Sequence, residues 1–228
     1  IQWTLIIISC LVTPNLNTIL CKCLNWINTN IIKLIFICSS CFEGSGLREI
    51  TITPNITKIG NHAFKSCALQ DIIIPDNVLS IGSYAFEDCS SLTGVTIGTG
   101  LTNLAYYIFN RCDSLTEINI PDNITTIYGY AFEGCSGLTS VTIGTGITSI
   151  YDNSFSGCTS LNSITCKAAT CPSISSYAFS EIGTNGFLYY PEDSNYNSWV
   201  NLLKPYGWTG VPKDMSPLQL NGYNMVAL

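Results

Sequence analysis

Cysteine is the residue type in this chain whose spacing suggests the widest range of chemistry, because a thiolate forms disulfides, binds metals and acts as a nucleophile. The sequence holds twelve cysteines, and five of them recur at a nearly fixed interval: Cys67, Cys89, Cys112, Cys135 and Cys158. Neighbours in this series could lie close enough for a disulfide. An odd-numbered series is more simply interpreted as packing, since a thiol can serve as a small buried apolar side chain.

The remaining cysteines suggest two further kinds of site. Cys166 and Cys171 stand near places where other copies of a repeated pattern have isoleucine, so they are interpreted as core substitutions, with a bridge between them as the alternative. Two pairs, C-x-C at 21–23 and C-x-x-C at 38–41, could supply four thiolates to a zinc ion. Their surroundings are strongly apolar and the first spacing is atypical, so we expect no metal site.

No other residue pattern indicates catalysis. The single histidine, His62, has no serine or carboxylate placed to complete a triad, and the carboxylates are spread along the chain instead of being paired. No phosphate-binding loop, dinucleotide fingerprint or H-E-x-x-H motif occurs. The net charge of −6, with only nine basic residues, lacks the basic surface that nucleic acid requires. We therefore expect no catalytic residue, no cofactor and no nucleic acid partner, and predict that the protein is not an enzyme.

The elements that must position these residues are copies of one unit. The copies begin at Leu47, Leu69, Leu92, Leu115, Leu138 and Leu161, and the central ones are 23 residues long. A fixed period of this length is typical of a solenoid, in which one unit cannot bury its apolar face alone but stacked units can. The repeat therefore predicts ladders of equivalent side chains, including a ladder of phenylalanines through Phe86, Phe109 and Phe132.

Each copy reads L-x-x-I-x-I, a turn, a second short apolar group and then A-F-x-x-C. The alternation at the start predicts a short strand with one buried face. The turn is Pro-Asp-Asn at 75–77 and 121–123, and Gly-Thr-Gly at 98–100 and 144–146. The A-F-x-x-C group is long enough for no more than a turn of helix.

This unit resembles the BspA-type leucine-rich repeats over residues 47 to about 208, with leucine, two isoleucines, phenylalanine and cysteine recurring in register. The resemblance implies an α/β leucine-rich-repeat solenoid of 23-residue units, β-dominated with short helical turns. It also implies a bacterial protein that is extracellular or at the cell surface, and a role in adhesion to host proteins or to other cells.

The first 46 residues do not follow the repeat cleanly, and three interpretations compete. Ile1–Cys10 ends like the signal of a bacterial lipoprotein, which would place a lipid tether on Cys10, although the basic region that such signals need is missing. Residues 24–46 keep the period of a degenerate repeat, since Leu24 precedes Leu47 by 23 residues. A frame slip in the upstream DNA would explain the same features. No run approaches the roughly 18 apolar residues of a membrane span.

The C-terminal part departs from the repeat. We expect the solenoid over 47–183 to be followed by a cap over 184–212, with a final strand at 187–190 and a helix whose N-cap is Asp193 or Ser194. Such a cap covers the apolar end of a stack. Residues 209–228 show no periodicity and are predicted to be coil, with 213–228 as the tail beyond the cap.

Two outward-facing rows are candidate binding surfaces. The strand face is Thr-rich and mildly acidic, with Glu49, Asp71 and Glu117 at one position and Thr96 and Thr142 at another. Elsewhere a stripe of tyrosines is formed by Tyr84, Tyr107, Tyr130 and Tyr177, with His62 and Asn153 at the same position in other copies. A solvated sheet face and plain stacking between repeats are the structural interpretations of these rows, but tyrosine is also common at interfaces.

With what the resemblance implies, we therefore predict a noncatalytic surface or secreted domain that recognises a protein or glycan on a host or neighbouring cell. The alternative is a structural spacer, or a repeat fragment of a larger surface protein, that has no ligand of its own.

Overall fold

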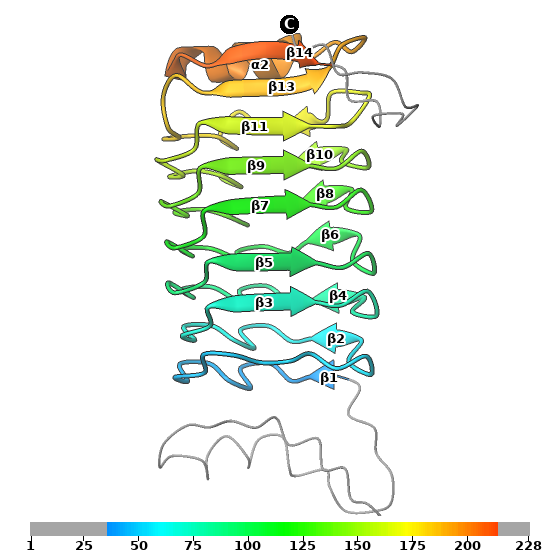
Figure 1. Cartoon of the computed structure of the whole chain (residues 1–228), viewed down its shortest axis with the longest axis vertical. Coiled ribbons are helices and arrows are strands. Elements are labelled where there is room, and N and C mark those ends of the chain that lie inside the picture. Colours follow the sequence, from blue (N-terminus) through cyan, green and yellow to red (C-terminus); the bar gives the residue numbers. More distant parts are fainter. Residues whose placement is uncertain (1–35, 214–228) are drawn as a thin grey trace, which may run out of the picture.

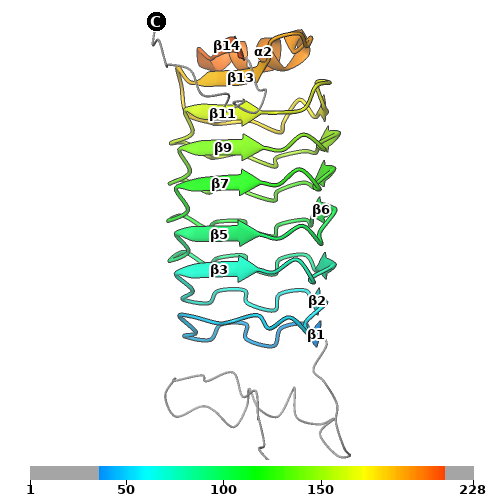
Figure 2. The same cartoon turned by 45° about the vertical axis from the view of Figure 1, so that its right-hand side comes forward.

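The computed structural model of the chain describes residues 36–213. The chain winds into a stack of similar turns, with the longer strands along one face and shorter strands set behind them (Figure 1, Figure 2). The predicted leucine-rich-repeat solenoid is confirmed: within residues 36–213 the regular elements are mostly strands, with one short α-helix near the C-terminal end. The predictions for the lipid tether at Cys10, for the cysteine pair at 21–23 and for residues 214–228 lie outside the described residues.

The longer strands are the L-x-x-I-x-I segments of the repeat. They are β3 (Asp71–Ile74), β5 (Gly94–Ile97), β7 (Glu117–Ile120), β9 (Ser140–Ile143) and β11 (Ser163–Cys166). Where they pair, they pair parallel and in register, so that Glu117 lies beside Ser140 and Ile118 beside Val141. Their side chains alternate between the core and solvent, as the sequence pattern predicted.

Shorter strands form a second parallel row. They are β1 (Phe36–Ile37), β2 (Lys58–Ile59), β4 (Ser80–Ile81), β6 (Asn103–Leu104), β8 (Thr126–Ile127), β10 (Ser149–Ile150) and β12 (Ser173–Ile174). In most of these pairs the first residue faces solvent and the second is buried. One apolar residue per turn thus closes the core on this side.

A column of phenylalanines fills the core. Its members are Phe42, Phe64, Phe86, Phe109, Phe132, Phe155 and Phe179, and all are buried. Consecutive ring centroids lie 5.1–5.5 Å apart, and the rings are nearly parallel. Aromatic pairs of this kind contribute about 0.5–1.5 kcal/mol each beyond their buried area. The predicted phenylalanine ladder is therefore the central packing element of the fold, and it extends to Phe42, upstream of the first clear repeat.

The five periodic cysteines form a second buried column. Each thiol donates a hydrogen bond to the backbone carbonyl of a phenylalanine in the preceding turn, for example Cys89 Sγ to Phe64 O at 3.1 Å and Cys135 Sγ to Phe109 O at 3.1 Å. Burial raises the pKa of Cys89 and of Cys135 to about 12. The column thus packs as neutral thiols that also satisfy carbonyl groups inside the core. Cys166 and Cys171, for which a bridge was the alternative, carry free thiols.

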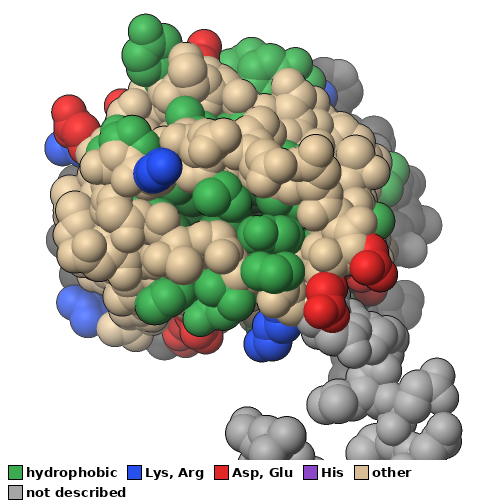
Figure 3. Space-filling model, turned by 90° about the horizontal axis from the view of Figure 1, so that it is seen from above, with side chains coloured by type: hydrophobic (Ala, Val, Ile, Leu, Met, Phe, Trp, Pro, Cys, Tyr) green, Lys and Arg blue, Asp and Glu red, His purple; other side chains and the backbone are tan. Residues whose placement is uncertain are grey.

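The C-terminal cap consists of β13 (Phe187–Pro191), the helix α2 (Asn197–Leu203), the 3-10 helix η1 (Lys204–Tyr206) and β14 (Thr209–Lys213). Trp199 of α2 extends the aromatic core, with its ring 5.4 Å from that of Phe179. Seen from this end, polar side chains and backbone cover much of the surface, and hydrophobic side chains are visible in its middle and at its rim (Figure 3). The cap therefore ends the stack in the way that the sequence predicted.

Two details of this cap were predicted wrongly. The helix follows Tyr196, not Asp193 or Ser194, because the Ser194 N–H and hydroxyl both bond to Pro191 O in a preceding turn. Tyr196 itself is buried, and its hydroxyl donates to Ala168 O at 2.7 Å. Residues 209–213 were expected to be coil, but they form β14, which pairs parallel with β13. Backbone pairing at a sheet edge requires no side-chain periodicity, so the sequence carries no signal for it.

Each Pro-Asp-Asn turn is hydrogen-bonded to the Gly-Thr-Gly turn of the next repeat. Asp76 Oδ1 accepts a hydrogen bond from the backbone N–H of Thr99 at 2.7 Å, and Asp122 Oδ1 accepts one from Thr145 at 2.8 Å. The bond from Thr99 lowers the pKa of Asp76. At Gly98, a Cβ atom would come within 2.6 Å of the backbone of Ile74 and Pro75, so only glycine fits above a Pro-Asp-Asn turn. A Pro-Asp-Asn turn and the Gly-Thr-Gly turn of the next repeat therefore pack together as a pair, so the turns repeat every two copies.

Candidate functional site

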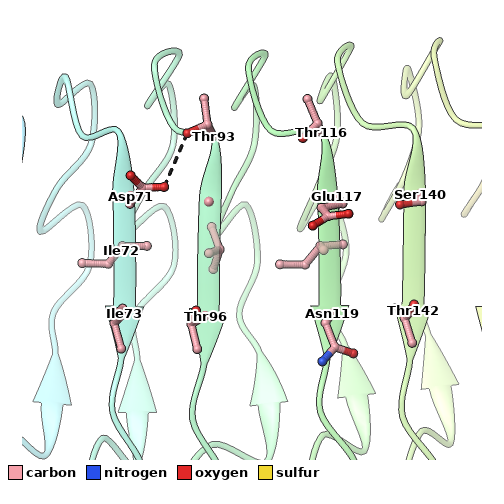
Figure 4. A pocket seen from close by; sticks show the side chains of 13 residues that line it. Asp71, Ile72, Ile73, Thr93, Thr96, Thr116, Glu117, Asn119, Ser140 and Thr142 are labelled. Atoms are coloured by element: carbon pink, nitrogen blue, oxygen red, sulfur yellow. Dashed lines mark hydrogen bonds between the residues drawn. The ribbon is translucent and has the colours of Figure 1, made fainter.

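The predicted residues of the strand face lie in two rows across neighbouring strands. Asp71, Gly94, Glu117 and Ser140 occupy one level of the sheet, and Ile73, Thr96, Asn119 and Thr142 occupy the level below (Figure 4). Glu49 precedes these strands and is exposed, but it does not line the hollow described below. The structure thus brings four of the five predicted strand-face residues together: Asp71, Glu117, Thr96 and Thr142.

A discontinuity crosses the strand face. Among the described residues β3 pairs with β5, and β7 continues through β9 and β11 to the cap, but β5 and β7 share no hydrogen-bonded ladder. After a strand that leads into a glycine turn, the glycine donates to the preceding repeat, as Gly98 N does to Ile74 O and Gly144 N to Ile120 O, both at 2.8 Å. Pro121 has no N–H and makes no such bond. The proline therefore explains why one backbone hydrogen bond is missing between β7 and β5, where the sheet is interrupted.

A hollow of about 550 Å³ lies over this discontinuity. Its floor includes Ile72, Val95 and Ile118, and of these three Val95 is only half-buried while the other two are buried. Asp71 and Glu117 stand on either side of Gly94, which has no side chain, and the Asp71 carboxylate reaches over it (Figure 4). The hollow therefore combines an apolar floor with two carboxylates, hydroxyl groups and an amide.

The tyrosine stack is the second candidate surface, and we use this name for His62, Tyr84, Tyr107 and Tyr130. Consecutive ring centroids lie 4.7, 4.5 and 4.5 Å apart, with interplanar angles of 11° or less. All four side chains are half-buried. Tyr177, predicted to belong to the same stripe, is separated from the stack by Asn153 and is 64% exposed.

The backbone of the tyrosine stack is left-handed. The φ angles are 56° at His62, 62° at Tyr84, 58° at Tyr107 and 63° at Tyr130, and Asn153 has 55° at the next copy. For a bulky residue this conformation is uncommon, whereas asparagine adopts it more readily. Burial, and then the neighbouring Tyr130 and Tyr84, raise the pKa of Tyr107, so its hydroxyl stays neutral. The stack therefore keeps large rings at a position that the backbone disfavours.

A second row of tyrosines was missed in the sequence. Tyr106, Tyr128 and Tyr151 stack with centroid distances of 4.9 and 5.5 Å. Tyr106 does not occupy the same place in the repeat as the other two. It covers Gly129, where a Cβ atom would lie 3.4 Å from the Tyr106 ring. The row was hidden because it combines two neighbouring columns of the repeat, although the consecutive pair Tyr106 and Tyr107 was visible.

The described part of the chain shows little that could support other chemistry. Within residues 36–213 no group of three or more His, Cys, Asp and Glu side chains is arranged to hold a metal ion. Over the same residues, no helix has the length and apolar character needed to cross a bilayer. His62 packs its ring on Tyr84 and faces no catalytic partner in the tyrosine stack. What the two surfaces offer is contact area and hydrogen-bonding groups.

Comparisons with known proteins place this geometry in a family. The model of the BspA-type leucine-rich repeat region matches six copies, over residues 17–139 and 125–193. No similar sequence was found among curated proteins. Among solved structures, a leucine-rich cell surface protein from Faecalibacterium prausnitzii is 40% identical, with a TM-score of 0.50, over 50% of this chain and 31% of that chain.

Two further structures are similar. A leucine-rich repeat protein from Eubacterium ventriosum is 30% identical, with a TM-score of 0.53, over 60% of this chain and 37% of that chain. A leucine-rich repeat protein from Bacteroides ovatus is 24% identical, with a TM-score of 0.52, over 78% of this chain and 51% of that chain, and supports the fold alone. The chain thus spans between about a third and a half of the length of these three structures.

Proposed function

The chain belongs to the BspA-type leucine-rich repeat family, and from this we propose that it is a noncatalytic recognition domain on the bacterial cell surface or secreted from the cell. Its partner is a protein or glycan on a host or neighbouring cell, and its role is in adhesion. The similarity to a protein described as a leucine-rich cell surface protein supports this location. A solenoid also supports recognition, because it presents an extended surface made of many small units.

The observation that carries the proposal is the tyrosine stack in its left-handed backbone. Tyrosine at such a position costs on the order of 1 kcal/mol, and it recurs at Tyr84, Tyr107 and Tyr130. Asn153 occupies the same position with a similar φ, so the fold does not require an aromatic ring there. A disfavoured residue that recurs on the surface is better explained by contact with a partner than by the fold.

The stack determines what kind of contact is made. Because each ring covers the face of the next, the parts of the inner rings that a partner can contact are their edges and hydroxyl groups. Such a row supplies rigid apolar area with hydrogen-bonding groups, the combination that favours tyrosine at interfaces. It suits the hydroxyl-rich surface of a glycan or the backbone and side chains of a folded protein.

The test replaces the stack by the residue that the repeat itself uses in its place. The variant Y84N/Y107N/Y130N is expected to lose binding on a glycan array and on a panel of immobilised extracellular-matrix proteins, while its circular dichroism remains that of the unmodified protein. Tyr177→Asn makes the same chemical change at the equivalent position outside the stack and is expected to keep binding. Unchanged binding by the triple variant would dispose of the stack as the site.

The spacer alternative makes a different prediction. A repeat segment without a ligand of its own would show no saturable binding to either panel, with or without the tyrosines. Saturable binding that the triple variant loses therefore separates the two functions.

A further inference from the structure

The hollow on the strand face has features that stacking of repeats does not require. Gly94 stands where Asp71, Glu117 and Ser140 stand in neighbouring strands, so one side chain is missing from the row. The missing side chain coincides with the missing ladder between β5 and β7. Both gaps open the same place on the surface, and none of the tyrosines lines it.

The charge of the hollow is negative on both sides. Asp71 leans over Gly94, and Thr93 Oγ1 donates to Asp71 Oδ1 at 3.4 Å (Figure 4). Glu117 lies at the same level on β7, on the other side of Gly94. No lysine or arginine lines the hollow, and the ion pairs of the described residues lie elsewhere: Lys65 with Glu87, and Arg111 with Asp88. The two carboxylates of the hollow therefore have no lysine or arginine of the hollow to neutralise them.

The floor of the hollow is apolar and suits a particular cation. Half-buried Val95, with Ile72 and Ile118 on either side, can pack against the methylene groups of a long basic side chain. A guanidinium group offers five donors in a planar fork, so it can bond to two carboxylates at once, whereas an ammonium group is a compact point charge that is more strongly hydrated. The shape and charge of the hollow together favour arginine.

We propose that the hollow binds an arginine side chain from an extended segment of a protein partner. The guanidinium lies above Gly94 and bonds to Asp71 and Glu117, and its stem rests on Val95. Thr96 and Asn119, on the level below, are within the same hollow and supply groups for the backbone of the segment. The inference rests on the proposed recognition function only in taking the partner to be a protein, because it uses a different surface from the tyrosine stack.

The test is a titration of the isotope-labelled protein with acetyl-Thr-Arg-Thr-amide, followed by backbone amide chemical shifts. The matched probe replaces arginine by citrulline, which keeps the size and removes the charge. Gly94→Ser fills the open position with the residue that Ser140 and Ser163 hold in other repeats. The Cβ added there meets Asp71 Oδ1, the end of a flexible side chain, so the fold is expected to persist. Glu49→Gln removes a carboxylate from the same row outside the hollow and serves as the control.

The arginine peptide is expected to shift the amides of β5 and β7 in a saturable manner, and the citrulline peptide to leave them in place. Asp71→Asn and Glu117→Gln should each weaken the affinity about tenfold, since each removes one charge-assisted contact. Gly94→Ser should abolish binding, and Glu49→Gln should leave it unchanged.

Three results would overturn the inference: equal binding of the citrulline peptide, unchanged affinity in Gly94→Ser, or no shift with either peptide. A titration with calcium chloride that moves the same amides more strongly than the peptide would also overturn it, in favour of a metal site. The variant Y84N/Y107N/Y130N is expected to bind the arginine peptide normally. The failure of this site and the failure of the tyrosine stack are therefore separate results.

Discussion

Two columns of stacked aromatic rings follow the same repeat two residues apart, yet they differ in every other respect. The phenylalanine column is buried throughout and has the same residue in each described turn, from Phe42 to Phe179. The tyrosine stack is half-buried, begins with His62 and gives way to Asn153. The difference shows that position relative to the core, not aromatic stacking itself, decides which column the fold depends on.

The largest loss of stability should come from a substitution in the phenylalanine column. Phe109→Ala removes a fully buried ring with a stacking partner on each side, Phe86 and Phe132. Truncation of a buried phenylalanine typically lowers the free energy of unfolding by about 3–5 kcal/mol. Chemical denaturation followed by circular dichroism measures this loss. A loss below about 1 kcal/mol would mean that the phenylalanine column does not carry the fold.

The column of buried cysteines should make the stability of the fold decrease at alkaline pH. Burial raises the pKa of Cys89 and Cys135 to about 12, above the value near 9 of an unfolded thiol. The folded state therefore holds protons that the unfolded state releases, and its stability is complete below pH 9 and falls between pH 9 and 12. The loss is about 1.4 kcal/mol per pH unit for each thiol within that interval.

Urea denaturation at pH 8 and pH 10 measures this dependence. The variant C89A/C135A is less stable at both pH values, but its stability should fall less between them. An equal fall in both proteins would contradict the assignment of the effect to these two thiols.

The tyrosine stack should contribute much less to stability than the phenylalanine column. Tyr107→Asn removes two ring contacts worth about 0.5–1.5 kcal/mol each. It also relieves a left-handed backbone strain of about 1–2 kcal/mol, so the two effects nearly cancel. The free energy of unfolding, measured as for Phe109→Ala, should change by no more than about 1 kcal/mol. A loss as large as that of Phe109→Ala would remove the distinction between the two columns.

The smallest effect on stability should follow from removing only the hydroxyl groups of the tyrosine stack. The variant Y84F/Y107F/Y130F keeps the rings, and surface substitutions of this kind change stability by about 0.5 kcal/mol or less. Its affinity for any partner found with the panels tells whether the ring edges or the hydroxyls make the contact. A large loss of stability would show that these hydroxyls have structural partners.

Much of the fold could be predicted because the repeat reports directly on packing. Phe86, Phe109 and Phe132 recur every 23 residues, and a buried column is the arrangement that brings them together. The buried place of Cys112 followed from the same spacing. The start of α2 was misplaced because Ser194, a favourable N-cap residue, uses its side chain in the turn at Pro191. The strand at Thr209–Lys213 depends on the backbone edge of β13, which no side-chain pattern reports.

The candidate surfaces were predicted only in part. The sequence indicated Asp71 and Glu117 on one face, but the hollow between them depends on Gly94 and on the strand discontinuity before Pro121. That proline was visible, and its missing N–H was the available signal. The left-handed backbone at Tyr107 could not be predicted, because tyrosine rarely adopts it. A residue that contradicts its backbone preference becomes informative only when the structure is known.

The most direct test of the account measures binding and unfolding on the same preparation of Y84N/Y107N/Y130N. The account predicts an unfolding midpoint close to that of the unmodified protein together with lost binding to the partner identified on the panels. Intact binding would contradict it, and so would a loss of binding that occurs only because the variant has unfolded.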